Sequence, residues 1–136
     1  MSGVKTFFDT NVLLYLLSED AAKADRVEEL LTGGGTISVQ VLNEFAAVAS
    51  RKLSLSWGEI KDILGPIRAI CEVDPVSIET HDRAIEIAGR YRFSFYDSAI
   101  VASALQSGCR ILYSEDFQHG QLIANQLRIR NPFMTA

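Results

Sequence analysis

The sequence predicts an α/β protein with a three-layer α/β/α arrangement, in which helices cover both faces of a central, mainly parallel sheet of four to five strands. Short apolar runs alternate along the chain with longer segments whose apolar residues recur at helical spacing. Strands that are separated by helices pair in parallel and are covered on both faces. A length of 136 residues suits one hydrophobic core, so we expect a single domain over residues 1–136.

The first half of the chain contains two strand–helix units. Residues 5–9 (KTFFD) form a short apolar run that ends in a carboxylate and passes directly into the helical segment NVLLYLL. Residues 21–31 have a helical apolar period, and the glycines at 33–35 end that helix. Thr36 and Ile37 are predicted as the next strand. Ser38 then caps a helix that extends to about Lys52.

The second half repeats this alternation. Ser56 and Glu59 have the spacing of a capping box, which predicts a helix from there to about Ile70. Gly108 has the position of a glycine that ends a helix. The remaining predicted elements are strands at residues 71–73, 110–113 and 127–129, and helices at residues 78–91 and 96–107.

Composition limits the classes of function. A content of 48% apolar and 22% charged residues is typical of a globular protein. A net charge of −4 argues against binding nucleic acid through a large basic surface, but it is compatible with a nuclease that gathers carboxylates around cations. The longest apolar run, residues 12–17, is too short to span a bilayer, and nothing resembles a signal peptide. Cys71 and Cys109 have no CxxC spacing and are expected to be reduced thiols, so we predict a cytoplasmic protein without membrane contact.

Acidic residues are predicted to gather at one edge of the sheet. Asp9 ends the first strand, and Glu115 and Asp116 directly follow a later one, which is where ligands bind in open parallel sheets. Asp97 lies in the first turn of its helix, and Glu44 lies inside an apolar helix. Like charges about 4 Å apart repel by roughly 4 kcal/mol at an effective dielectric constant of 20. Convergence of these side chains therefore predicts a bound divalent cation.

Oxygen ligands favour Mg²⁺ or Mn²⁺, and such ions bind a scissile phosphate and lower the pKa of a water molecule. The only histidines, His81 and His119, are not at ligand spacing. Each acid also has a structural interpretation: Asp9 as a helix cap, Asp97 as a helix-start residue, Glu44 as a solvated side chain. The spacing of the acids leaves both interpretations open.

Four segments together resemble the motifs of PIN domains, in the right order and over nearly the whole chain. They are FFDTNVLLY at residues 7–15, VLNEF at 41–45, FYDSAIVASAL at 95–105 and ILYSEDFQHG at 111–120. The pattern is especially similar to the VapC toxins of bacterial VapBC toxin–antitoxin pairs.

This resemblance implies roles for individual residues. Asp9, Glu44, Asp97 and Asp116 would hold the Mg²⁺ or Mn²⁺ and act as the catalytic set. Thr10 and Asn11 would form hydrogen bonds near Asp9 or the phosphate, and the Ser114 hydroxyl would orient a carboxylate. The family often has a further acid where this chain has Gln118, which leaves a second ion open, with Glu115 as a possible substitute.

The resemblance also implies a homodimer that cleaves a structured RNA at a particular site and is silenced by a cognate VapB-like antitoxin. We therefore predict a metal-dependent endoribonuclease that is the toxin of a type II pair. The alternative is a non-catalytic PIN-like module that binds RNA or protein. A receiver domain is disfavoured because no lysine follows Lys61, and a haloacid-dehalogenase phosphatase because Asn11 stands where a second aspartate is needed. Trp57 and Tyr96 are expected in the core or at a dimer interface rather than stacked on bases.

Overall fold

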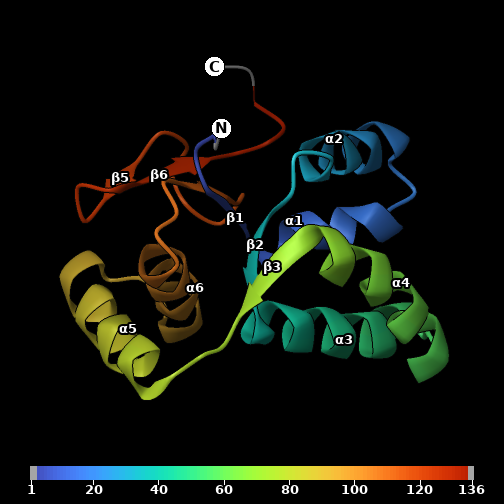
Figure 1. Ribbon diagram of the computed structural model, residues 1–136, viewed down its shortest axis with the longest axis horizontal. Coiled ribbons are helices and arrows are strands. Elements are labelled where there is room, and N and C mark those ends of the chain that lie inside the picture. Colours follow the sequence, from blue (N-terminus) through green and yellow to red (C-terminus); the bar gives the residue numbers. More distant parts are fainter. Residues whose placement is uncertain (1–2, 135–136) are drawn as a thin grey trace.

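The computed structural model describes residues 3–134 and has helices on both sides of one sheet (Figure 1). The strands are β1 (Thr6–Phe8), β2 (Gly35–Ser38), β3 (Cys71–Asp74), β4 (Ile111–Tyr113), β5 (Leu122–Ile123) and β6 (Leu127–Arg130). The helices are α1 (Thr10–Leu14), the 3-10 helix η1 (Tyr15–Leu17), α2 (Ala21–Leu31), α3 (Val39–Leu53), α4 (Trp57–Ile70), α5 (Ile78–Tyr91) and α6 (Phe95–Gln106).

The sheet has the strand order β3-β2-β1-β4-β6-β5, and every neighbouring pair is parallel except β5 and β6. In β1, Phe7 is in register with Thr36 of β2 and Leu112 of β4. Helices α5 and α6 cover one side, and α1 to α4 lie on the other (Figure 1). The predicted three-layer α/β/α class with a mainly parallel sheet is confirmed.

One strand was not predicted, so the sheet has six strands in the described residues instead of four to five. Strand β5 has two residues and pairs antiparallel with β6 through Ile123 and Leu127. Between them, Ala124 and Asn125 adopt positive φ angles of 50° and 56°. Two residues are too few to show the alternation of apolar and polar side chains by which strands are predicted.

Side-chain caps define the helix boundaries that the sequence predicts. The Ser38 hydroxyl accepts a hydrogen bond from the Val41 amide at the start of α3. At α4, Ser56 and Glu59 form a complete capping box. Gly108 follows α6 with φ of 75°, a conformation that glycine adopts without a steric penalty. These signals involve residues close in sequence, which is why they can be recognised without a structure.

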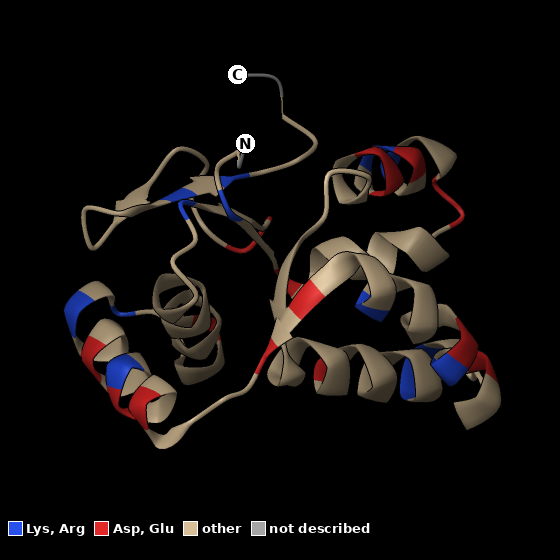
Figure 2. Ribbon diagram, viewed as in Figure 1, with Lys and Arg blue, Asp and Glu red and all other residues tan. Residues whose placement is uncertain are grey.

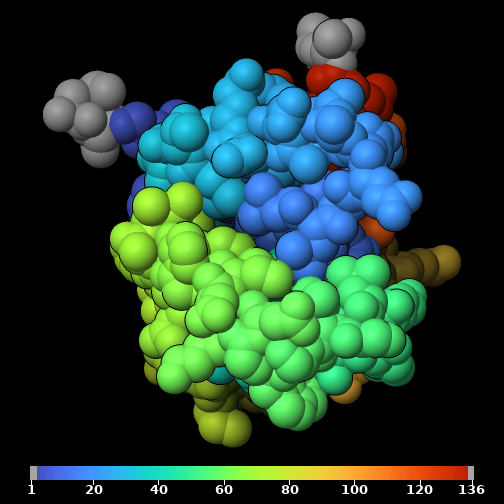
Figure 3. All heavy atoms as spheres, turned by 90° about the vertical axis from the view of Figure 1, so that its right-hand side faces the viewer, coloured from blue at the N-terminus to red at the C-terminus, as the bar shows by residue number. Residues whose placement is uncertain are grey.

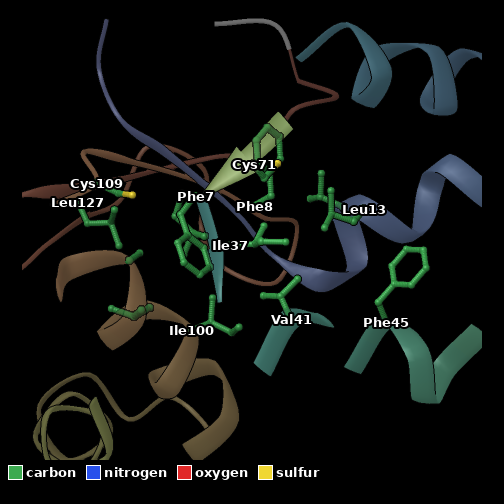
Figure 4. Close-up of a cluster of buried hydrophobic side chains, with 14 of the residues drawn as sticks. Phe7, Phe8, Leu13, Ile37, Val41, Phe45, Cys71, Ile100, Cys109 and Leu127 are labelled. Carbon is green, nitrogen blue, oxygen red and sulfur yellow. The ribbon is translucent and has the colours of Figure 1, made fainter. Parts of the chain in front are cut away.

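The core lies on both faces of the central strands (Figure 4). Successive side chains of a strand point to opposite faces, so Phe7 faces Ile100 of α6 whereas Phe8 lies on the side of Leu13. Gly35 allows the Phe8 ring to approach closely, because a Cβ atom there would lie 2.3 Å from Phe8 Cε2. This packing fixes β1, and with it the position of Asp9 at its end.

On one face of the molecule, blue and green in Figure 3, α1 packs against α3, α3 packs against α4, and α2 packs against η1. This arrangement brings the start of α1 beside the middle of α3, where Thr10 contacts Glu44. In residues 3–134, no helix is long and apolar enough to cross a membrane.

Candidate active site

A cleft of about 290 Å³ opens at the carboxyl end of β1, and the four predicted acids line it. They come from four segments that are far apart in the sequence: the end of β1, α3, α6 and the loop after β4. Those residues are Asp9, Glu44, Asp97 and Asp116. The parallel topology places strand ends and helix starts at the same edge of the sheet, which explains the convergence.

Asp9 is the most buried of these acids, with 5% of its surface exposed. One carboxylate oxygen accepts a hydrogen bond from the Thr10 amide at 2.7 Å, and the other accepts one from Ser114 Oγ at 2.7 Å. Burial, together with the negative charge of Asp116, raises the pKa of Asp9 to about 7, although the bond from Ser114 acts in the opposite direction. Two hydrogen bonds therefore fix the position of the Asp9 carboxylate, but no cationic side chain in the described residues pairs with it.

Glu44 lies on α3, and a residue of α1 contacts its carboxylate. Its Oε1 atom accepts a hydrogen bond from Thr10 Oγ1 at 2.7 Å. Thr10 thus contacts two of the acids, Asp9 through its amide and Glu44 through its hydroxyl.

Asp97 lies in the first turn of α6, where its amide donates a hydrogen bond to the capping hydroxyl of Ser94 at 3.2 Å. Burial raises the pKa of its carboxyl, and the charges of Asp116 and Glu44 add to this effect. These three acids line the same cleft, so the negative charges of Asp116 and Glu44 disfavour ionisation of Asp97.

Asp116 lies in the loop after β4 and is exposed to solvent. Its amide donates to Ser114 Oγ at 3.0 Å, and its Oδ2 accepts from Asn11 Nδ2 at 3.2 Å. Because the Ser114 hydroxyl also donates to Asp9, it links the two acids. Ser114 and Asn11 therefore lie where a side chain that orients carboxylates is needed.

Glu115 lies outside this set, although it was considered as an additional ligand. Its Oε1 atom accepts a hydrogen bond from the Tyr15 hydroxyl at 2.6 Å, and its Oε2 lies 3.8 Å from Lys23 Nζ. It is not among the residues that line the cleft. The structure thus places Glu115 on the side of the loop away from Glu44 and Asp97.

The four acids have no cationic partner within the described residues: each ion pair there joins other side chains. Acidic and basic residues are mixed along α5, whereas α6 is almost entirely uncharged apart from Asp97 (Figure 2). Arg51 lines the cleft without pairing with an acid. Across residues 3–134, no three His, Cys, Asp or Glu side chains enclose a single point closely enough to form a complete ligand group.

The donor set nevertheless fits Mg²⁺ or Mn²⁺. The four acidic side chains at the cleft offer oxygen, and no histidine or cysteine lines it, which disfavours zinc. Mg²⁺ keeps several water ligands and is often held by one or two carboxylates together with substrate phosphates. Acids that line an open cleft are suited to such an ion.

Two residues of the cleft were not expected there. Tyr96 is 68% exposed and lines the cleft, and Trp57 is 69% exposed elsewhere, so a core position is wrong for both. Arg51 also lines the cleft, and nothing in the local sequence distinguishes it from the other basic residues of the chain. It follows Glu44 by seven residues, which is two helical turns and hence the same face of α3.

Comparison with known proteins agrees with this geometry. The family model described as the PIN domain matches residues 6–122. A search of curated protein sequences returned no match.

Solved structures with similar folds include a toxin–antitoxin complex from Klebsiella pneumoniae, with a TM-score of 0.73, 16% identity and coverage of 96% of this chain and 100% of that one. The structure of FitAB bound to a DNA fragment gives a TM-score of 0.74, 16% identity and coverage of 96% and 97%. A VapC toxin of Mycobacterium tuberculosis that cleaves the sarcin–ricin loop gives a TM-score of 0.67 and 18% identity, with coverage of 82% of this chain and 90% of that one. At this level of identity the likeness to these structures concerns the fold alone. The family model matches most of the chain, and this protein therefore belongs to the PIN-domain family.

Proposed function

We propose that this chain is a Mg²⁺- or Mn²⁺-dependent endoribonuclease and the toxin of a type II toxin–antitoxin pair. Family membership supports a nuclease in general terms. The single observation that carries the finer proposal is the set of four acidic side chains that line one cleft without a cationic partner in the described residues. Leaving such charges together is costly unless the protein binds cations there.

Asp9, Glu44, Asp97 and Asp116 are the proposed ligands. A divalent ion held there would stabilise negative charge on the phosphodiester being cleaved and lower the pKa of a water molecule. Ser114 keeps the carboxylates of Asp9 and the loop of Asp116 in place through its two hydrogen bonds. Thr10 holds Glu44 toward the same cleft.

An antitoxin has a suitable surface beside this cleft. A groove of about 370 Å³ shares Asn11, Val48 and Asp116 with the cleft. Its apolar walls come from α1, η1 and α3 and consist of Leu14, Leu17, Val48 and Leu53. We propose that a VapB-like partner lays an apolar segment in this groove and directs a basic side chain at Asp116. This proposal is supported by the similar fold of the toxin–antitoxin complex from Klebsiella pneumoniae.

We also propose that the protein acts in the cytoplasm as a homodimer, with residues 1–136 forming one domain. Ile78 and Ile85 are 75% and 54% exposed and lie two helical turns apart on α5, which suits a surface covered by a second copy. Light scattering of the purified protein is expected to give twice the chain mass, and a shift toward one chain mass in an Ile78→Asp, Ile85→Asp variant.

The nuclease is tested by incubating antitoxin-free protein with total cellular RNA in Mg²⁺ or Mn²⁺. We expect discrete fragments that disappear with EDTA and in an Asp97→Asn variant. Asp82→Asn is the matched control, because Asp82 is an exposed acid of α5 outside the cleft. RNA that is bound but never cut by wild-type protein would favour the non-catalytic binding module instead.

The toxin assignment is tested separately in cells. Induced expression is expected to arrest growth, and Asp97→Asn is expected to abolish the arrest. Co-expression of a cognate antitoxin, sought as a small reading frame beside this gene, is expected to restore growth. Normal growth of cells that accumulate active wild-type protein would contradict a toxin and leave the nuclease intact.

A further inference from the structure

Tyr96 is a large aromatic side chain that the fold leaves in water at the edge of the acidic cleft. It is 68% exposed, it precedes Asp97 directly, and it lines the same cleft. Burial of a large aromatic ring is usually favourable, and aromatic side chains contribute much of the stabilisation in interfaces. An exposed ring beside a catalytic acid therefore suggests a ligand that packs on it.

Neighbouring rings restrain Tyr96. The Tyr96 and Phe95 rings meet edge to face, with their centroids 5.7 Å apart. Phe95 in turn contacts His81 of α5 at 5.6 Å. Tyr96 is thus supported from the α5 side while most of its own surface remains available. A preorganised ring loses little conformational entropy when a flat ligand stacks on it.

Arg51 lies on the α3 side of the same cleft. It shares a helix face with Glu44, which lies two turns earlier in α3. Within residues 3–134 its guanidinium forms no ion pair with an acid. A free guanidinium is well suited to bind a phosphate, and it also offsets the repulsion between the acidic cleft and a polyanion.

We propose that Tyr96 stacks on an unpaired base next to the scissile phosphate while Arg51 binds a neighbouring phosphate of the same strand. This inference rests on the proposed ribonuclease function and names two residues that select its substrate. Base–aromatic stacking accepts any base, because every base has a π-face. In an RNA duplex the base faces are already stacked, so this site selects unpaired nucleotides rather than a particular base.

The test measures stacking separately from cleavage. The probe is a short single-stranded RNA with 2-aminopurine at one position, mixed with the protein in EDTA so that no cutting occurs. The fluorescence of 2-aminopurine falls when it stacks. Wild-type protein and Tyr96→Phe are expected to quench this fluorescence. Tyr96→Ala is expected to bind the RNA about tenfold more weakly and to cause no quenching. The same RNA in a duplex is expected to bind more weakly and to show no Tyr96 dependence.

Two surface residues provide matched controls. Trp57 is as exposed as Tyr96 but lies on α4 outside the cleft, so Trp57→Ala is expected to leave quenching and affinity unchanged. Arg51→Ala is expected to weaken RNA binding and to make the dependence of log affinity on log salt shallower by the equivalent of about one phosphate contact. Quenching at saturating protein is expected to persist in this variant. Arg68→Ala removes an equal charge from α4 and is expected to have little effect.

The outcomes separate this inference from the proposed function. If wild-type protein cuts RNA and Tyr96→Ala binds, quenches and cuts equally well, the stacking role is wrong and the nuclease stands. If the loss in Tyr96→Ala is confined to dimer mass or antitoxin affinity, Tyr96 belongs to a protein interface and the inference is overturned. Quenching that depends on Tyr96 in a protein that never cuts would support the stacking site and contradict the nuclease. Circular dichroism checks that each variant folds.

Discussion

Glu115 and Asp116 are adjacent in the chain, but their surroundings treat their charges in opposite ways. Glu115 accepts a hydrogen bond from Tyr15 at 2.6 Å and lies 3.8 Å from Lys23 Nζ. Asp116 faces the cleft with Asp9, Glu44 and Asp97, and none of these four has a cationic partner in the described residues. The carboxylate of Glu115 thus has a cationic partner, whereas that of Asp116 has none in the described residues.

We interpret this difference as that between an acid that supports the fold and an acid of the proposed metal site. The Lys23 ammonium also lies 4.8 Å from the centre of the Tyr15 ring and 4.9 Å from that of Phe133. The Glu115 cluster therefore joins the loop after β4 to η1, α2 and the segment after β6. The acids of the cleft have no cationic partner in the described residues, and the pKa of Asp9 is raised, mainly by burial and further by the negative charge of Asp116.

The largest expected effect is on cleavage. Asp116→Asn removes a proposed ligand and is expected to reduce the cleavage rate about a hundredfold or more, because stabilisation of transition-state charge is lost. Glu115→Gln, one residue away, is expected to change it less than about threefold. Gel assays of both variants on one RNA measure the contrast. Equal losses in the two would contradict the assignment of Glu115 to structure.

The next largest effect concerns Ser114. Ser114→Ala removes the hydroxyl that bonds Asp9 and the Asp116 amide, and it is expected to weaken Mn²⁺ binding about 10- to 100-fold by calorimetry. Ser103→Ala is the matched control, because the buried Ser103 hydroxyl has no hydrogen-bond partner in the described structure. Unchanged Mn²⁺ affinity in Ser114→Ala would show that the hydroxyl does not position the acids.

The pH dependence of stability tests whether the Asp9 carboxyl is buried without a compensating positive charge. Its pKa is raised from 3.8 to about 7, so between these values the folded state binds more protons than the unfolded state. The free energy of unfolding therefore falls as pH rises from about 4 to about 7. The raised pKa of Asp97 acts in the same direction.

We expect the melting temperature of metal-free protein, measured in EDTA, to decline across this range. Asp9→Asn is expected to flatten the decline, because asparagine does not titrate. A melting temperature that rises with pH in wild-type protein would mean that the cleft already compensates its charges.

The smallest effect is expected in the Glu115 cluster. Tyr15→Phe removes the hydroxyl that donates to the partly exposed carboxylate of Glu115 and accepts from Lys23 Nζ, and it is expected to cost about 1 kcal/mol of unfolding free energy, measured with urea. Cleavage is expected to remain close to that of wild type. Tyr96→Phe removes a hydroxyl from an exposed tyrosine and is expected to leave stability unchanged. A stability loss as large in Tyr96→Phe would remove the basis for the Tyr15 assignment.

Local signals predict most of the elements of this fold. Ser38, Ser56 and Ser77 accept hydrogen bonds from amides three residues later, so these helix starts are encoded within four residues. Strand β1 was recognisable because an apolar run passes straight into a helix at Asp9. Strand β5 was missed, because a two-residue strand exists only through its pairing with β6.

The candidate site divides in the same way. The four acids were predictable because each carries an unusual charge in an apolar setting or follows a strand, and the family resemblance joins them. The bond from Thr10 to Glu44 spans 34 residues and has no counterpart in the local sequence. Nor could the sequence show that adjacent acids diverge, with Glu115 turned to Tyr15 and Asp116 to Asn11.

Short-range chemistry in the chain thus accounts for the helix caps, the apolar periods and the identity of the acids, since each depends on residues within a few positions. Tertiary packing was needed to order the strands, to expose Tyr96 beside Asp97 and to bring Arg51 to the same cleft. The physical reason is distance: the cleft is built from segments more than 100 residues apart, as the bond between Ser114 and Asp9 shows with a separation of 105. Which carboxylates remain unneutralised depends on those long-range contacts.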